Sequence, residues 1–409
     1  MTRDYLPGIM RVFSNITPVV IFFIFAQIVN VSELGLINYF ISLITILGIF
    51  TDFGLPEAIQ RFLPQVKDKA KLITYTIKLE ILIVLIGAFL FLMLDLLTKG
   101  DFSKGYLFIL ILTFIFSASN TIILIFNGLE EKKKLTEYFA YSSLLFLTIT
   151  FNLYFIFDFD PVTSFIYGRL ISWAIYTIIP LYHLYKQKLL LQQEFNIKQH
   201  TKFNKFAKNT FIYMASLTLL TQWDSILITN IDGTYTNGLY KSVAFIATIP
   251  IVLITILHTK LLPLFSKLNA KKRFQEIQML LQKYIKYLLI ILGISFLIQL
   301  FIYKYILNIF LTEEVVKNAG HLFPIIFLAV CLQILISPYI SALQAIGQAR
   351  ILRNLTIIQV FTFILFSIIL YPSYSYNILP TLLVIINTVM FFLITLITYN
   401  KIHYRNNVS

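Results

Sequence analysis

Three ionisable side chains lie inside long apolar stretches of the sequence, where a charged group needs a partner or a water-filled cavity. Arg169 and Asp224 each lie about seven residues inside such a stretch, which is about 10 Å deep at 1.5 Å per helical residue. Lys241 lies a few residues inside a third stretch. Charged groups at this depth could bind an anion, bind a coupling ion or close a gate.

Two interpretations of these three residues remain open. In the first, Arg169 and Lys241 hold the phosphate oxygens of a substrate, and Asp224 orders these cations or binds a coupling ion. In the second, Arg169 and Asp224 form a salt bridge or gate, while Lys241 extends outward to the membrane interface. Arg169 and Lys241 are thus candidate substrate-binding residues, and Asp224 is a candidate for ion coupling or gating.

A second group of charged residues lies in the segment TDFGLPEAIQR, residues 51–61. Its Gly-Leu-Pro sequence predicts a break in the helix, which frees backbone groups that need water or protein partners. Glu57 and Arg61 stand four residues apart, so they can pair on one helix face. Arg61 either binds a substrate headgroup at an inward-facing entrance or lies at the interface beside this local partner. Asp52 and Glu57 are further candidates for ion coupling or gating.

Glu80 lies about 12 Å into the next apolar stretch by the same helical rise. It can face a cavity, as an ion-coupling or gate candidate, or pair with the basic residues around Lys78, and we expect the pair. The single cysteine, Cys331, lies inside an apolar stretch and cannot build a disulfide framework or a metal cluster. No phosphate loop of the form GxxxxGKS or GxxxxGKT occurs. We therefore expect neither a metal site nor a cofactor.

The elements that carry these residues must lie in a membrane. Of the 409 residues, 58% are hydrophobic and only 13% are charged, about half the charged share of roughly 25% that soluble domains have. Apolar runs of about 18 or more residues recur, and about 20 span the hydrocarbon layer. The sequence therefore predicts an all-α polytopic membrane protein. Its net charge of +14 lies in short breaks between apolar runs, as membrane topology predicts, so we expect no nucleic-acid partner.

Twelve of the apolar stretches are long enough to be transmembrane helices. Every second break between them is rich in Lys and Arg, whereas the opposite breaks hold only Lys99, Lys104 and Lys317. Basic loops face the cytoplasm, so both termini are expected on that side. The expected spans are residues 8–29, 36–63, 72–97, 105–128, 137–157, 162–185, 209–231, 237–262, 281–310, 320–345, 353–371 and 379–400.

The longest polar break, residues 186–208, is basic and partly amphipathic, so we expect a linker along the inner membrane surface. It separates a six-helix bundle in residues 1–185 from a second one in residues 209–409. The halves echo one another, since Gly-Leu opens both the second and the eighth span, and small residues precede basic turns at corresponding places. An even number of spans in each half predicts a parallel repeat with pseudo-two-fold symmetry and a site between the halves.

Three segments resemble the polysaccharide-exporter branch of the multidrug/oligosaccharidyl-lipid/polysaccharide (MOP) flippase superfamily, which includes the flippases of O-antigen and other lipid-linked oligosaccharides. Residues 33–65 are similar to the family's Gly-Leu entry into the second span and its DFGL…R exit. Residues 223–246 resemble the Asp of its seventh span and the Gly-hydrophobic-Tyr opening of its eighth. Residues 343–350, LQAIGQAR, resemble the turn after its tenth span. The resemblance in span number and topology covers the whole chain.

This resemblance implies two six-helix bundles arranged in a V around a central cavity that opens alternately to each membrane face. It implies movement of an undecaprenyl-pyrophosphate-linked oligosaccharide, such as an O-antigen repeat unit, from the inner to the outer leaflet of the bacterial cytoplasmic membrane. The expected partners are this lipid-linked substrate, membrane lipids, a coupling H⁺ or Na⁺ and a polysaccharide polymerase. Because the substrate carries a pyrophosphate and a polar glycan, the cavity should be wet and cationic.

Three other functions are weaker matches to the sequence. A drug or cation antiporter of the multidrug and toxin extrusion (MATE) type shares the fold, but its cavity would favour acids and aromatic residues over Arg169 and Lys241. A flippase of peptidoglycan precursors usually has extra spans, and the sequence shows none. A polytopic glycan polymerase or glycosyltransferase needs a large loop or an Asp-x-Asp motif, and the one match, residues 158–160, lies in a short outer turn. We therefore expect a transporter rather than an enzyme.

Overall fold

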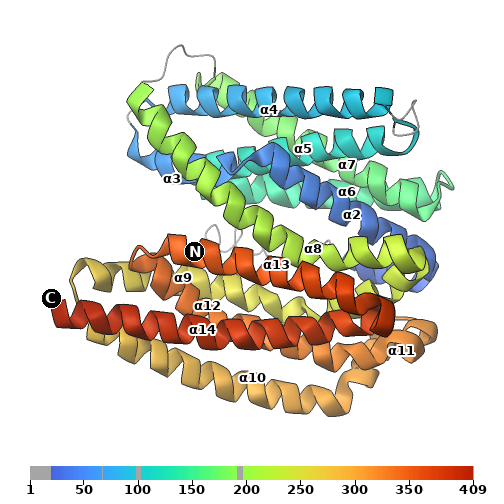
Figure 1. Cartoon of the computed structure of the whole chain (residues 1–409). Coiled ribbons are helices and arrows are strands. Elements are labelled where there is room, and N and C mark those ends of the chain that lie inside the picture. The colour runs from blue at the N-terminus through green and yellow to red at the C-terminus, as the bar shows by residue number, and fades with distance from the viewer. Residues whose placement is uncertain (1–19, 67, 98–102, 130, 191–196, 409) are drawn as a thin grey trace, which may run out of the picture. The chain divides into compact units, whose positions relative to one another are not determined.

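A computed structural model describes residues 20–66, 68–97, 103–129, 131–190 and 197–408, which are almost entirely helical (Figure 1). No β-strand occurs in these five ranges. The chain divides into two compact units, Met1–Gln222 and Trp223–Ser409, which we call the first and the second unit. The expected all-α architecture is therefore confirmed.

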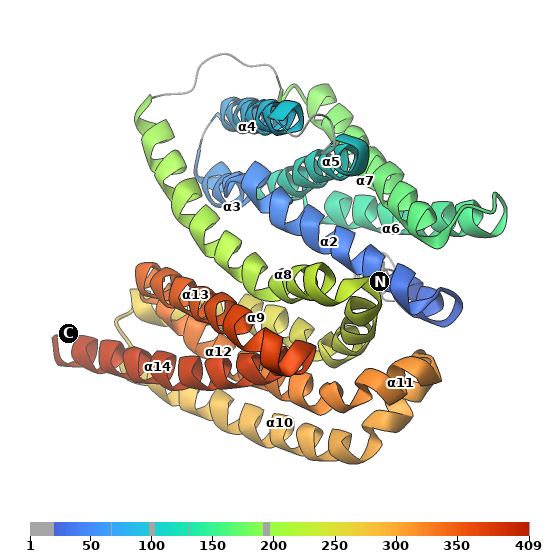
Figure 2. The same ribbon diagram turned by 45° about the vertical axis from the view of Figure 1, so that its right-hand side comes forward.

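Besides helical residues 20–28, the described part of the first unit contains seven helical elements and the start of an eighth, seen from two sides in Figures 1 and 2. They are α2 (Val31–Asp52), α3 (Leu55–Phe62), η1 (Leu63–Gln65), α4 (Lys69–Leu97), α5 (Ser103–Gly128), α6 (Lys132–Phe155), α7 (Pro161–Lys186) and the beginning of α8 (Ile197–Ala247).

The second unit contains the rest of α8 and nine further elements. They are η2 (Ile249–Ile251), α9 (Val252–Ala270), α10 (Phe274–Phe310), α11 (Glu313–Ala319), η3 (Gly320–Leu322), α12 (Phe323–Ala345), α13 (Ala349–Tyr374), η4 (Ser375–Asn377) and α14 (Ile378–Val408).

Nine helical segments in the described part of the chain are long and apolar enough to cross a membrane. One of them, residues 201–247, contains one expected span and the start of a second, and another, residues 350–404, contains two. The first of these turns at Gly233, whose φ of 86° lies in the left-handed region that glycine favours. The expected first span, residues 8–29, lies largely outside the described residues. The chain is a multi-pass membrane protein.

Polar residues fix where two of the helices begin. The Asn30 side chain accepts a hydrogen bond from the Glu33 amide at 2.9 Å, and Glu33 accepts one from the Asn30 amide, which forms a capping box for α2. The Asp160 carboxylate accepts a hydrogen bond from the Thr163 amide at 2.9 Å at the start of α7, and Pro161 occupies the first turn. These caps satisfy backbone N–H groups that have no partner within the helix.

The expected helix break in the segment 51–61 is present. Phe53 and Gly54 both have positive φ, 47° and 70°, between the end of α2 and the start of α3. A Cβ atom on Gly54 would lie 2.2 Å from the carbonyl oxygen of Ala207 and 2.7 Å from the amide nitrogen of Phe211. Only glycine therefore lets α8 pass so close to the break. The break leaves Asp52 at the end of α2, inside the unit.

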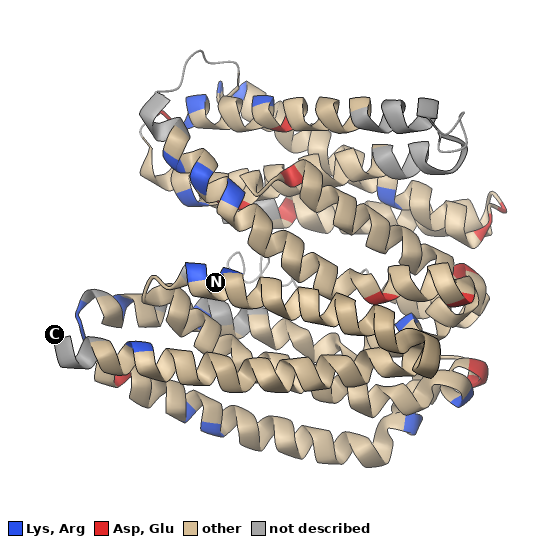
Figure 3. Ribbon diagram, in the orientation of Figure 1, with Lys and Arg blue, Asp and Glu red and all other residues tan. Residues whose placement is uncertain are grey.

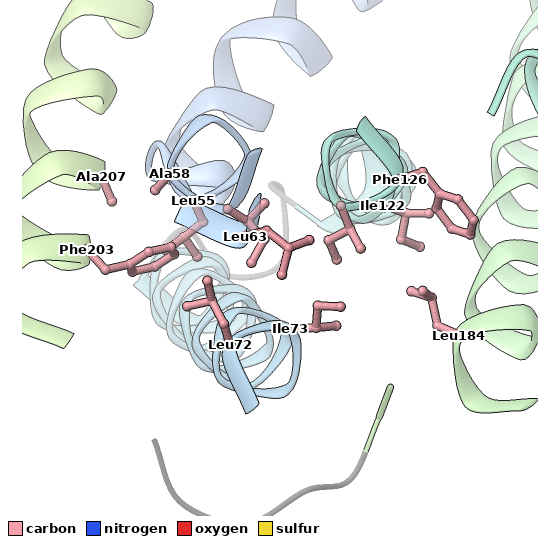
Figure 4. Packing of buried hydrophobic residues seen from close by; sticks show 12 residues of the cluster. Leu55, Ala58, Leu63, Leu72, Ile73, Ile122, Phe126, Leu184, Phe203 and Ala207 are labelled. Atoms are coloured by element: carbon pink, nitrogen blue, oxygen red, sulfur yellow. The ribbon is translucent and has the colours of Figure 1, made fainter. Parts of the chain in front are cut away.

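An apolar cluster joins α3, α4, α5 and α7 to the beginning of α8 in the first unit (Figure 4). Surrounding lipid is as apolar as these side chains, so such helices are held by close packing rather than by exclusion of water. The cluster consists of Leu55, Ala58, Ile59, Leu63, Leu72, Ile73, Ile122, Ile125, Phe126, Leu184, Phe203 and Ala207.

Charged side chains are distributed unevenly within each unit. Most of the described lysines and arginines lie toward one end of the helices in each unit taken by itself (Figure 3). This is the pattern that the basic breaks in the sequence predict. The cytoplasmic position of that end, the position of both termini and the linker at residues 186–208 stay predictions.

Candidate functional site

A cavity of about 300 Å³ lies inside the first unit, between α2, α5, α6 and α7. We call it the Arg169 cavity, because Arg169 is the one basic residue among the described residues that line it, and no carboxylate is among them. Hydroxyl, amide and aromatic groups make up much of the remaining wall. They belong to Thr45, Ser119, Asn120, Ser142 and Ser143 and to Phe40, Phe116, Phe139, Phe165, Trp173 and Tyr176, and aliphatic side chains form the rest of the wall.

The Arg169 guanidinium lies among aromatic rings. Its central carbon is 3.9 Å from the ring centroid of Phe146, 5.5 Å from that of Trp173 and 5.8 Å from that of Phe165. No described carboxylate lies within 4.0 Å of it. Cation–π contacts partly replace the lost hydration. A guanidinium has five N–H donors, and no described carboxylate takes those of Arg169.

The position of Arg169 depends on the residue before it. A Cβ atom on Gly168 would lie 2.1 Å from the Thr150 hydroxyl oxygen and 3.3 Å from the Thr150 Cα. Glycine therefore allows α7 to approach the backbone of α6, which also carries Phe146. This close approach brings the guanidinium over the Phe146 ring.

Glu80 and Asp52 are buried beside one face of α5. The Asn120 side-chain amide donates to the Asp52 carboxylate at 2.7 Å, while the hydroxyls of Ser117 and Thr121 donate to one oxygen of Glu80 at 3.0 and 2.9 Å. Both carboxylates are only 6% exposed.

The expected pairing of Glu80 with the basic residues around Lys78 is therefore wrong. Two residues apart on a helix, the side chains of Lys78 and Glu80 point to different faces, and Lys78 is exposed. Neutral donors from α5 take the place of the lysine.

In the described part of the chain, no three His, Cys, Asp or Glu side chains come together as they would around a metal ion.

Arg61 lies on an aromatic ring instead of its predicted local partner. Its guanidinium carbon is 4.4 Å from the ring centroid of Phe206 on α8 and 5.9 Å from that of Phe62. The described residues include no ion pair between Glu57 and Arg61, so that expectation is also wrong. The physical reason is that α8 packs on the eight-residue helix α3 and offers the guanidinium a ring that sequence spacing does not reveal.

The second unit holds the other two sequence candidates in a single ion pair. The Lys241 ammonium donates to the Asp224 carboxylate at 2.7 Å, and the two side chains are 15% and 10% exposed. The interpretation in which Lys241 extends outward to the membrane interface is therefore wrong. Next to Asp224, Trp223 donates to Ser367 at 2.9 Å and Ser225 shares a hydrogen bond with Asn237. The functional roles of the pair stay predictions.

Comparison with known proteins decides the family. The sequence matches the family described as polysaccharide biosynthesis proteins over residues 8–269, which is more than half of the chain. The chain belongs to this polysaccharide biosynthesis family. The resemblance to polysaccharide exporters of the MOP superfamily is thereby confirmed. No curated protein sequence matches the chain.

Solved structures of MOP-superfamily transporters share the fold of this polysaccharide biosynthesis protein. A MATE-family multidrug-resistance transporter in an inward-facing conformation has a TM-score of 0.72 and 13% identity, over 98% of this chain and 96% of that one. A Pyrococcus furiosus transporter, described as having a binding pocket of reverse polarity, has a TM-score of 0.69 and 14% identity, over 99% and 96%. The Vibrio cholerae MATE transporter VcmN has a TM-score of 0.64 and 14% identity, over 97% and 98%. The two-lobed twelve-helix fold is thus confirmed.

In this polysaccharide biosynthesis protein, sequence reasoning missed the uncharged residues that contact the buried acids or line the Arg169 cavity. Asn120 and Thr121 follow Ser117 by three and four residues in one apolar stretch, which puts both on the same side of the helix as Ser117. That clustering of polar residues was the available signal. Trp173 lacked even that, because one aromatic residue in an apolar stretch is not distinctive.

Proposed function

We propose that this protein moves undecaprenyl-pyrophosphate-linked oligosaccharides, such as O-antigen repeat units, from the inner to the outer leaflet of the bacterial cytoplasmic membrane by alternating access. The observation that carries the proposal is Arg169, a cation without a described carboxylate partner in a cavity that also offers hydroxyl and amide groups. Membership of the polysaccharide biosynthesis family and the MOP fold support the same substrate class.

The chemistry of the cavity suits the two polar parts of such a substrate. A guanidinium binds two phosphate oxygens at once through its planar N–H donors, and it keeps its charge inside a membrane. Ser142, Ser143 and Asn120 can exchange hydrogen bonds with phosphate or sugar hydroxyls. The rings of Trp173 and Tyr176 provide flat apolar surfaces for the faces of sugar rings.

The other charged candidates receive secondary roles in this proposal. Lys241, held by Asp224, and Arg61, on the ring of Phe206, are additional cations that the anionic substrate meets at other stages. The buried carboxylates Asp52 and Glu80 are the candidates for coupling to H⁺ or Na⁺, with Asp224 and Glu57 as alternatives. A polysaccharide polymerase would take over the exported repeat unit.

Replacement of Arg169 in a strain that lacks the chromosomal copy tests the proposal. We expect Arg169→Gln to abolish surface glycan and to cause lipid-linked repeat units to accumulate at the inner leaflet, with normal amounts of protein in the membrane. Arg169→Lys should retain partial export, because it keeps the charge but not the planar pair of donors. Arg353→Gln, at the start of α13 in the second unit, is the matched control. Normal surface glycan from Arg169→Gln would refute the proposed substrate site.

Multidrug antiport is the second candidate, because the aromatic wall of the Arg169 cavity and the buried carboxylates nearby would also suit an organic cation. The guanidinium argues against it, since like charges repel. An antiporter would lower the accumulation of a cationic dye such as ethidium, and Arg169→Gln should then improve dye export. If the protein is a flippase, neither the parent protein nor Arg169→Gln should change the accumulation of ethidium.

A further inference from the structure

Two buried carboxylates from different helices meet on one face of α5. Asp52 ends α2 and Glu80 lies within α4, and both are 6% exposed. Three donors reach them: Ser117, and Asn120 and Thr121, which follow Ser117 by three and four residues and so lie on its side of the helix. We call the two acids the Asp52–Glu80 pair.

The described surroundings of this pair contain no cation. The groups that act on Asp52 are Ser117 and Asn120 on α5, Glu80 on α4 and Glu57 on α3. Glu80 accepts hydrogen bonds from two neutral hydroxyls. Two negative charges buried beside the same face of α5, in a site of low dielectric, repel one another, which favours the retention of a proton by one of the two acids.

A hydrogen-bond count shows which of the two acids has room for an exchangeable proton. Ser117 lies between the acids, and its single hydroxyl hydrogen goes to Glu80. Asn120 donates to one oxygen of Asp52, and the other Asp52 oxygen is buried with no hydrogen-bond partner among the described residues. A buried acceptor without a donor is strongly disfavoured. This orphaned oxygen is an observation independent of the charges, and it shows that Asp52 has an oxygen free to take up a hydrogen.

Asn120 connects the Asp52–Glu80 pair to the Arg169 cavity. Its amide donates to Asp52 at 2.7 Å, and the same residue lines the cavity together with Arg169 and Trp173. An asparagine amide has an acceptor oxygen on one side and two N–H donors on the other. Whichever side it turns to Asp52 therefore determines what it can offer to the cavity.

We propose that the Asp52–Glu80 pair holds one exchangeable proton and that Asn120 acts as a positioning residue, whose amide orientation couples the protonation of Asp52 to anion binding in the Arg169 cavity. When Asp52 is ionised, it accepts from the Asn120 N–H group, and the amide oxygen is left for the cavity, where it repels phosphate oxygens. When Asp52 takes up a proton from water, its hydroxyl donates to the amide oxygen. The amide then turns, and its N–H donors join Arg169 in binding phosphate.

This inference rests on the proposed function and names its coupling ion as H⁺. Proton uptake favours diphosphate binding, and by linkage diphosphate binding favours proton uptake to the same degree. The gain should be about tenfold in affinity, the size of one hydrogen bond to a charged group. The exchange needs no further reactant, because water supplies the proton and receives it again.

Infrared spectroscopy of the purified protein in lipid nanodiscs tests the proton site without any substrate. We expect the carbonyl band of a protonated carboxylic acid at neutral pH, shifted by deuterium exchange and lost in both Asp52→Asn and Glu80→Gln. Asp158→Asn, in the exposed turn before α7, is the control and should keep the band. A spectrum without this band, or carboxylate bands that sodium ions shift instead, would overturn the proposal.

Tryptophan fluorescence tests the connection to the cavity. The chain has two tryptophans, so Trp223→Phe leaves Trp173 as a reporter in the Arg169 cavity. The probe is inorganic pyrophosphate, and its affinity is measured at alkaline and at mildly acidic pH in the parent protein and in Asp52→Asn. We expect the gain in affinity at acidic pH to be about tenfold larger in the parent protein than in Asp52→Asn. This comparison removes the titration of pyrophosphate itself. Asn120→Ala should keep the infrared band but lose the additional pH dependence.

The outcomes separate this inference from the proposed function. Pyrophosphate binding with the same pH dependence in the parent protein, Asp52→Asn and Asn120→Ala would overturn the role of Asn120. If pyrophosphate does not bind the parent protein at all, while the infrared band is present and sensitive to both acids, the proposed anion site fails and the proton site stands. If the infrared band is absent from the parent protein while pyrophosphate still binds and its binding depends on Arg169, the proton site fails and the proposed anion site stands.

Discussion

The two units treat their buried cations in opposite ways. In the first unit, the guanidinium carbon of Arg169 lies 3.9, 5.5 and 5.8 Å from three aromatic ring centroids, and no described carboxylate lies within ion-pair distance. In the second, Lys241 is 2.7 Å from Asp224 in a pair that is largely buried. A paired charge is already neutralised and stabilises its own unit, whereas an unpaired one has donors available for a ligand.

The contrast extends to the acids. Asp224 has a lysine partner, but the Asp52–Glu80 pair in the first unit has only neutral donors. The first unit thus contains a cation without an acid and acids without a cation, separated by the side chain of Asn120. Opposite charges that could neutralise one another are kept apart, which is the arrangement that binding and coupling need rather than the one that maximises stability.

The largest expected effect on stability comes from breaking the pair in the second unit. Asp224→Asn or Lys241→Met alone should lower the free energy of unfolding by about 3–5 kcal/mol, because each leaves the other charge buried without a partner. The double variant should recover much of that loss. Thermal unfolding in detergent measures all three. Single variants as stable as the parent protein would show that the pair is solvated and would remove the contrast between the units.

A smaller effect is expected where α7 meets α6. Gly168→Ala places a Cβ 2.1 Å from the Thr150 hydroxyl oxygen, and overpacking of this kind costs about 1–3 kcal/mol. The helices must separate, so Arg169 should also lose its position and pyrophosphate should bind more weakly. Gly293→Ala is the control, because a Cβ at Gly293 would meet nothing within 4 Å. Unchanged unfolding temperature and binding in Gly168→Ala would show that the approach of α7 does not position Arg169.

The sequence was sufficient to predict the fold, because long apolar stretches and alternating basic breaks are imposed by the bilayer itself. It was also sufficient to single out Arg169, since a charge inside an apolar stretch is conspicuous. The pairing of Asp224 with Lys241 could have been predicted in part. They lie nine residues before and eight residues after Gly233, so a helical hairpin that turns there places them at equal depth.

The partners of Glu80 and Arg61 could not be predicted by the same reasoning. Local spacing suggested a lysine for Glu80 and Glu57 for Arg61, but the structure provides hydroxyls of α5 and the ring of Phe206. These partners are 37 to 145 residues away in the sequence, and they depend on which helices pack together. Short-range rules describe isolated helices, whereas helix packing decides the partners of a buried charge.

Arg169→Gln should have a small effect on stability, in contrast to the paired residues. The variant loses cation–π contacts, each contributing about 0.5–2 kcal/mol, but it also removes a charge that is costly to bury. We therefore expect the unfolding temperature to change little while pyrophosphate binding is lost. Thermal unfolding and Trp173 fluorescence give the two readouts. A destabilisation as large as that of Lys241→Met would mean that Arg169 has a structural partner and is not held for a ligand.

A modest, pH-dependent effect on stability is expected at the start of α7, the helix that carries Arg169. Partial burial raises the pKa of Asp160, but hydrogen bonds from Thr163 and nearby backbone amides outweigh it and hold the pKa below its usual value. A lowered folded-state pKa stabilises the protein above the unfolded-state pKa of about 3.9, and this stabilisation is lost as the pH falls through the folded-state value. Asp160→Ala should cost about 1 kcal/mol at neutral pH. The difference in unfolding temperature between Asp160→Ala and the parent protein should become smaller below about pH 4. A difference that does not depend on pH would show that the ionised carboxylate is not the cap.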